Sequence, residues 1–142
     1  MTTANPSNAG VDYARDYATR VPFAEHLGFR IDHLEDGLAR LSCELRPEMT
    51  NSWGMAHGGV IATLLDVTLC MAARTQHPGS KGIMTIDMSI SFIGPGTSPL
   101  RAEGRVMKPG KNTIFAEAEV RNGEGALVAK AIGTLRARYP EK

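Results

Sequence analysis

The stretch NSWGMAHGGVIATLLDVTLCMAAR, residues 51–74, decides the fold of this chain. Residues 58–73 are nearly all apolar or small, and Asp66 is the only charged residue among them. The pattern predicts a helix from Gly58 to Gln76, ended by Pro78. Because the helix is apolar around most of its circumference, other elements must enclose it.

The segments around this helix alternate apolar and polar residues with the period of two that is typical of strands. Two strands are predicted before the helix, at about 29–33 and 39–45, with a turn at 35–37. Four follow it, at about 84–92, 101–106, 114–120 and 126–138. Short helices are predicted over residues 11–20 and from Pro22 to Gly28. Hairpin turns imply antiparallel pairing, so we expect an α+β fold with one antiparallel sheet curled around the long helix.

The composition is that of a globular protein. The 142 residues fit one domain, which we place at 21–142 after a partly flexible N-terminal segment, 1–20, whose first ten residues are expected to fray. Hydrophobic residues make up 42% and charged residues 22%, and the net charge of +1 gives no indication of nucleic-acid or membrane binding. There is no signal-peptide pattern and no apolar run of transmembrane length, so a cytoplasmic location is expected.

Metal and cofactor sites are not indicated. Cys43 and Cys70 lie in apolar segments without metal-ligand spacing and are expected to be reduced packing residues. The histidines fall in different predicted elements: His26, His33, His57 and His77. Neither a GxSxG nucleophile elbow nor a phosphate-binding P-loop is present, so we expect no metal and no cofactor.

Asp66 is the puzzle of the central helix. Its neighbours along one stripe are all small: Gly59, Ala62, Thr63, Cys70 and Ala73. One interpretation is that the stripe faces solvent and that Asp66 is a solubilising charge. However, the stripe has no Lys, Glu or Gln, and Asp is a poor helix former. The alternative is a carboxylate in a partly dry crevice, where it can act as general base or nucleophile.

The start of the same helix offers a second functional group. His57-Gly58-Gly59 leaves the first amides open to a substrate, and the positive end of the helix dipole favours an oxyanion there. However, Gly58 and Asp66 lie about 10–12 Å apart along one helix. A base and an oxyanion donor must both lie near the reacting atom. The conflict disappears if two subunits pack these helices antiparallel, which predicts a two-fold homodimer with two sites.

The spacing of Asn51, His57-Gly58-Gly59 and Asp66 resembles the signature of hotdog-fold acyl-CoA thioesterases, in particular the phenylacetate-pathway (PaaI-like) branch. The strand GIMTIDMSISFIGP (82–95) and the hairpin VMKPGKNTIFAEAEV (106–120) are also similar to that family, and the resemblance covers about 22–138. It implies a hotdog fold, a long helix wrapped by an antiparallel sheet, in homodimers that often pair into homotetramers.

The resemblance also implies roles for individual residues. Asp66 would act as general base on water or as nucleophile, and the Gly58 amide would polarise the thioester carbonyl. Asn51 would help position the carbonyl or the water, and Thr85 falls where related enzymes carry a hydroxyl that helps hold the water. His57 matches the motif, but a histidine packed at a helix start is more often structural.

Other residues are candidates for contacts with the rest of the substrate. Four basic residues of one predicted hairpin can bind the phosphates of coenzyme A or can be ordinary solvated charges: Arg101, Arg105, Lys108 and Lys111. Gly59 lies beside the expected oxyanion donor. Trp53 and Met55 can line an acyl pocket or cover a subunit interface.

We therefore expect an acyl-CoA thioesterase that converts acyl-CoA and water into free acid and coenzyme A. One alternative is a hotdog hydratase or dehydratase that acts on the acyl chain. Another is a non-catalytic acyl-CoA binding module. The sequence leaves the acyl group open, whether aromatic, medium-chain or hydroxylated.

Overall fold

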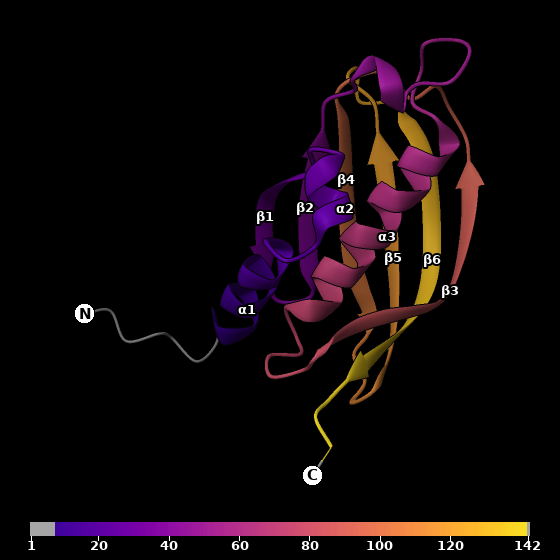
Figure 1. The fold of residues 1–142 in the computed structure, drawn as a ribbon. Helices are drawn as coiled ribbons and strands as arrows, with labels where there is room; N and C mark the ends of the chain where they lie inside the picture. The colour runs from indigo at the N-terminus through magenta and orange to yellow at the C-terminus, as the bar shows by residue number, and fades with distance from the viewer. Residues whose placement is uncertain (1–7, 142) are drawn as a thin grey trace.

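A computed structural model describes residues 8–141 of the chain (Figure 1). Its helices are α1 (Ala9–Ala18), α2 (Pro22–His26) and α3 (Gly58–Arg74), with a short 3₁₀ turn at Pro47–Met49. Its strands are β1 (Arg30–Glu35), β2 (Leu38–Cys43), β3 (Gly82–Phe92), β4 (Leu100–Lys108), β5 (Thr113–Arg121) and β6 (Leu127–Arg138).

All six strands belong to one antiparallel sheet in the order β1-β2-β4-β5-β6-β3. The sheet curves around α3, and α1 and α2 lie beside α3 on the same side, in front of β1 and β2 (Figure 1). This arrangement confirms the expected α+β hotdog fold. Because β3 pairs with β6 only, it forms one edge of the sheet.

The core is built where α3 meets the concave face of the sheet. Leu64, Leu65, Leu69 and Met71 are fully buried there, and each contributes about 1.5–3 kcal/mol relative to an exposed side chain. The helix approaches the sheet most closely at Gly104 of β4, where a Cβ atom would lie 2.9 Å from the Thr68 carbonyl oxygen. A glycine at this position therefore sets how deeply α3 sits in the sheet.

The structure differs from the prediction by a few residues at most element ends, and two differences show their physical cause. Helix α3 ends at Arg74 rather than Gln76, and the Thr75 hydroxyl donates to the Ala72 carbonyl while it accepts from the Gly37 amide. This side chain closes the helix and ties it to the β1–β2 turn. The 3₁₀ turn at 47–49 was not predicted, because Pro47 was interpreted only as the end of a strand.

Strand β3 departs from the strict alternation that the sequence predicts for 84–92, which would put Met84 and Ile86 on the same face as Met88. The register to β6 shifts between Thr85 and Asp87, which is a β-bulge that puts one extra residue into β3. As a result Thr85 faces α3, whereas Met84 and Ile86 are 46% and 58% exposed. Beyond the bulge, Met88 resumes packing against the core.

The N-terminal segment is described only from Asn8 onward. The predicted fraying of residues 1–10 falls mostly on residues 1–7, which lie outside the described part. Helix α1 packs against α3 and the loop that follows it. The Tyr17 ring lies 4.2 Å from the Arg74 guanidinium at the end of α3, and the Tyr13 hydroxyl bonds to Ser80 in the loop. Within residues 8–141, no helix is long and apolar enough to span a bilayer.

Candidate active site

Asp66 is half-buried on α3 and is held by a residue of β3. Its Oδ1 atom accepts a hydrogen bond from the Thr85 hydroxyl, and the Cys70 thiol lies 3.9 Å from the same oxygen and 3.4 Å from the Thr85 hydroxyl. No protein donor to Oδ2 is found in the described part of the chain. The carboxylate is thus anchored through one oxygen and free to act through the other.

Cys70 is a member of this cluster that sequence reasoning assigned to packing alone. Burial, and after it the charge of Asp66, raise the pKa of the Cys70 thiol to about 11. The thiol therefore stays protonated at neutral pH and can donate toward the carboxylate but is a poor nucleophile. The sequence indicates this contact only through spacing, because Cys70 follows Asp66 by four residues, which is one helical turn. Cys43 is also a free, buried thiol, with its pKa raised mainly by burial.

The bulge in β3 places Thr85 in the cluster. With strict alternation Thr85 would share the face of Asp87, on the side of the sheet away from α3. The extra residue re-aims its side chain toward the helix, which is a known use of bulges near functional sites. The candidate residues Asp66 and Thr85 thus come together in one cluster.

The first turn of α3 has one open amide. The Gly59 amide donates to His57 Nδ1 at 2.8 Å, and the Val60 and Ile61 amides donate to the His57 carbonyl. Among residues 8–141 we find no acceptor for the Gly58 amide. Because His57 Nδ1 accepts, its ring proton lies on Nε2, and the side chain acts as the helix N-cap. The Gly58 amide is therefore open to an acceptor from outside the described chain, whereas the amide of Gly59 is occupied.

Asn51 shapes the loop that precedes α3. Its Oδ1 atom accepts from the Trp53 amide at 2.9 Å and from the Met55 amide at 3.2 Å, so the loop closes as an Asx turn. Only the side-chain amide nitrogen of Asn51 is left for a substrate or water. Trp53 lies at the tip of this loop, 79% exposed, and Met55 is half-buried.

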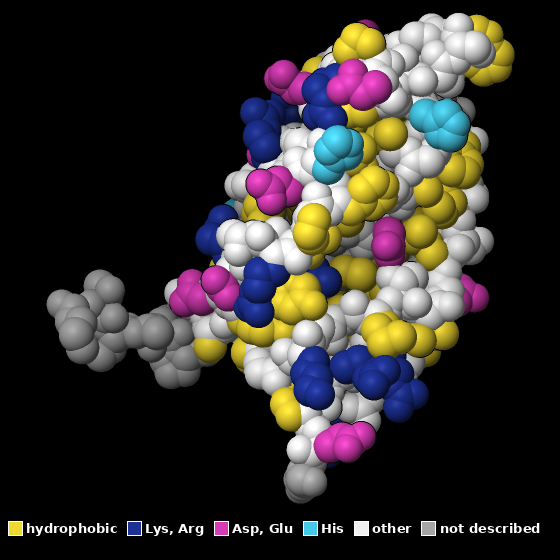
Figure 2. All heavy atoms as spheres, in the orientation of Figure 1, with side chains coloured by type: hydrophobic (Ala, Val, Ile, Leu, Met, Phe, Trp, Pro, Cys, Tyr) yellow, Lys and Arg dark blue, Asp and Glu magenta, His cyan; other side chains and the backbone are white. Residues whose placement is uncertain are grey.

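Asp66 and Gly58 stay apart within one chain. They are eight positions apart on α3, which corresponds to about 12 Å along the helix axis. The face of the molecule over α3 and β3 carries many hydrophobic side chains with few charges among them (Figure 2). Exposed apolar residues of β3 and of the turn after it include Ile86, Phe92 and Ile93.

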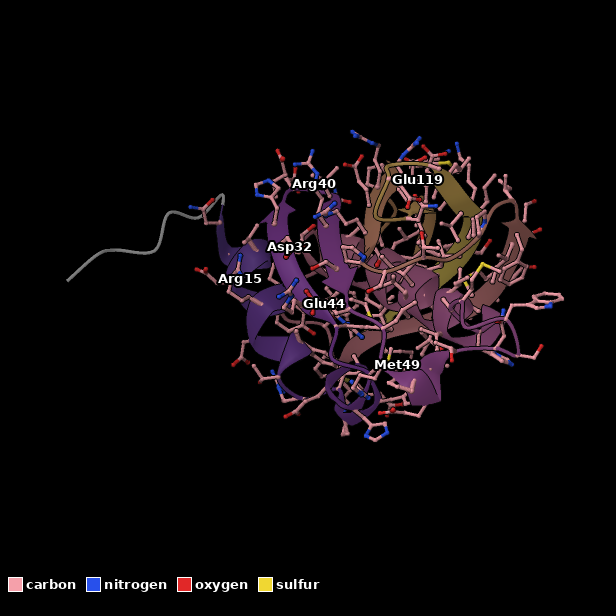
Figure 3. All side chains as sticks on the ribbon, turned by 90° about the horizontal axis from the view of Figure 1, so that it is seen from above. Arg15, Asp32, Arg40, Glu44, Met49 and Glu119 are labelled. Carbon is pink, nitrogen blue, oxygen red and sulfur yellow. The ribbon has the colours of Figure 1, made fainter. Side chains whose placement is uncertain are left out.

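The basic candidates lie elsewhere. Lys108 and Lys111 are exposed at the β4–β5 hairpin, beside the C-terminal end of α3 and away from the loop that carries Trp53 (Figure 1). Arg101 and Arg105 are exposed on β4. Their outward-facing neighbours Arg40 and Glu119 point away from α3 in Figure 3. These four basic residues therefore do not meet Asp66 in one protomer.

Within residues 8–141, no cluster of three or more His, Cys, Asp or Glu side chains has the geometry to hold a metal ion. The four histidines lie at the end of α2, on β1, at the start of α3 and after its end. Burial lowers the pKa of His77, whose Nδ1 atom lies 2.7 Å from the Tyr139 hydroxyl. This pair packs at the far end of α3 from Gly58.

Comparison with known proteins agrees with this geometry. A family model described as the thioesterase superfamily matches residues 54–129. A putative esterase of Saccharolobus solfataricus is 33% identical over 82% of this chain and 85% of its own. The Escherichia coli medium/long-chain acyl-CoA thioesterase YigI is 27% identical over 83% of this chain and 86% of its own.

A solved structure supports the fold independently. The structure of the E. coli PaaI protein from the phenylacetic acid degradation operon superimposes with a TM-score of 0.85, at 24% identity, over 94% of this chain and 96% of its own. At this identity the likeness concerns the fold. The family match, which spans α3 and the strands β3, β4 and β5, and the 33% identity to the S. solfataricus esterase show that the chain belongs to the thioesterase superfamily.

Proposed function

We propose that this protein is an acyl-CoA thioesterase of the PaaI-like branch that hydrolyses an acyl- or aryl-CoA thioester to free acid and coenzyme A. The observation that carries the proposal is that two groups on one helix have no protein partner among residues 8–141. These are the Oδ2 atom of Asp66 and the amide of Gly58. The 27% identity to YigI, an acyl-CoA thioesterase, supports the substrate class.

The working unit of the proposal is a homodimer in which the two α3 helices run antiparallel. A two-fold axis near Ala62, midway between Gly58 and Asp66, brings Gly58 of one protomer opposite Asp66 of the other. The small and half-exposed residues Ala62 and Thr63 permit this close approach. The edge strand β3, eleven residues long with exposed Ile86 and Phe92, is the other surface that a partner would cover.

The chemistry follows from these positions. Asp66 Oδ2 removes a proton from water while the water oxygen attacks the thioester carbonyl carbon. The Gly58 amide of the partner protomer donates to the oxyanion that forms. The carbon–sulfur bond then breaks, and the thiolate of coenzyme A takes up the proton. In the alternative, Asp66 attacks the carbonyl carbon itself, and the carbon–sulfur bond breaks to release the coenzyme A thiolate. Water then hydrolyses the resulting anhydride and supplies the proton for the thiolate. The Thr85 hydroxyl fixes the carboxylate in both cases.

The remaining site residues have supporting roles in the proposal. His57 caps α3 and, by occupying the Gly59 amide, leaves Gly58 as the donor. The Asn51 side-chain amide can contact the carbonyl or the water, and Trp53 and Met55 border the site of the partner protomer. Lys108 and Lys111 are candidates for the phosphates of coenzyme A.

We further propose that the dimers pair into a homotetramer. Apolar side chains on the outer sheet face support this, because Phe115 and Ile132 point away from α3 and are 41% and 53% exposed. Light scattering during gel filtration should give four times the chain mass of 15.3 kDa. A stable dimer at assay concentrations would contradict the tetramer, and a monomer would contradict both levels of assembly.

Replacement of Asp66 by Asn is expected to lower kcat for thiol release by about 10²–10⁴-fold, because the amide cannot take the proton. The oligomer and the thermal midpoint should stay near those of the wild type. Asp32→Asn, the same change at an exposed position on β1, is the control and should leave kcat unchanged. Undiminished hydrolysis by Asp66→Asn would defeat the assignment. Double-bond formation in the acyl chain, or tight binding without turnover, would point to the alternative functions.

The Gly58 amide can be removed with little disturbance of the helix. Gly58 is the first residue of α3, a position that favours proline, and His57 already has the extended backbone (φ −62°, ψ 140°) that proline requires of its predecessor. Gly58→Pro should therefore fold but lose about 10²–10³-fold in kcat. Gly58→Ala keeps the amide, and its Cβ would meet only the Phe92 ring at 3.5 Å. Equal activity of the two variants would show that this amide is not the oxyanion donor.

A further inference from the structure

An apolar cavity lies on the side of α3 that faces away from β3. It is partly open to solvent, has a volume of about 400 Å³ and is formed by α1, α2 and α3 above β1 and β2. Its walls are mostly aliphatic: Ala18, Ala24, Ile31, Leu41, Val67 and Met71. The residues assigned above to the chemistry do not line it.

The residue that follows the candidate base forms part of the cavity wall. Val67 directly follows Asp66 on α3, is half-buried and lines the cavity, and Met71 continues that wall one turn further along the helix. The Asp66 side chain itself bonds to Thr85 of β3 and does not line the cavity. The path that the inference requires, from a carbonyl at Asp66 into the cavity, passes over Val67.

We propose that this cavity binds the acyl chain of the substrate and that the chain is aliphatic and of medium length. The inference rests on the thioesterase activity proposed above and adds the substrate class. An aromatic ring would fill the space poorly, because a cavity of about 150 Å³ is enough for benzene. The space left around a ring would forfeit packing contacts, whereas a flexible chain can fill it.

The polar residues of the cavity mark its outer rim. Arg15 of α1 and Glu25 of α2 line the cavity and are exposed. Arg15 lies on α1 at the outer edge of the molecule, beside β1 (Figure 3). A chain that outgrows the cavity would meet these charged side chains and water, so extra methylene groups beyond that point should add little.

The first experiment measures kcat/KM for thiol release from linear acyl-CoA substrates of four to sixteen carbons and from phenylacetyl-CoA. Each methylene group that becomes buried is worth up to about fourfold. We expect kcat/KM to rise through the medium chain lengths and then level off, with phenylacetyl-CoA below octanoyl-CoA. A flat profile, or a preference for phenylacetyl-CoA over every linear substrate, would overturn the proposal.

The second experiment fills the cavity from its wall. Ala18 is half-buried and lines the cavity, whereas Ala9 on the same helix is exposed and does not. Ala18→Phe should lower the decanoyl-to-butyryl ratio of kcat/KM by about tenfold, the worth of about two buried methylene groups. Ala9→Phe, the matched control, should keep the wild-type ratio. Val21→Phe, which fills the cavity from the start of α2, replaces Ala18→Phe if thermal melting shows that the latter is unfolded.

The outcomes separate this inference from the proposed function. If the wild type hydrolyses acyl-CoA but a folded filling variant keeps the wild-type chain-length ratio, the acyl chain does not occupy this cavity and the inference is wrong. If the wild type releases thiol from none of the substrates, the thioesterase proposal itself fails. A selective loss for long chains supports both.

Discussion

A single carboxylate on an otherwise apolar helix is the constraint on which this structure depends. A buried or half-buried charge is costly unless its oxygens are satisfied. Asp66 is satisfied on one side only, by the hydroxyl of Thr85 and the protonated thiol of Cys70. The second oxygen of Asp66 and the amide of Gly58 are left without protein partners among residues 8–141. Because both lie on one rigid helix, about 12 Å apart, a second protomer is the simplest way to use them together.

Three parts of the α3 surface make different contacts. One face packs into the sheet through Leu64, Leu65 and Leu69, and the tight contact at Gly104 fixes its depth. In the account proposed here, the stripe with Asp66 meets β3 and the partner protomer, and the side with Val67 opens toward the cavity beneath α1 and α2. In this account the sheet, a partner protomer and a substrate enclose the helix on all sides, which explains why it carries so few charges.

Much of the fold could be predicted from the sequence, because α3 and the strands have clear periodicities. Asp66 could be identified by its isolation and Gly58 by its place at the helix start, whereas the hydrogen bond that occupies the Gly59 amide could not be foreseen. The bulge in β3 could not be predicted, since Met84 and Ile86 continue an apolar alternation that the backbone interrupts. The roles of Cys70 and Asn51 depend on contacts across elements or on loop geometry. The cavity arises from the packing of three helices on two strands, which no local pattern encodes.

A mixed-subunit assay tests the central claim most directly. Asp66→Asn and Gly58→Pro chains, each inactive alone, are unfolded together, refolded and assayed for thiol release. If a site takes Asp66 from one protomer and Gly58 from its partner, half of the randomly formed dimers contain one intact site. The mixture should then recover about one quarter of the wild-type activity. A mixture that forms mixed dimers and stays as inactive as its components would contradict the shared site.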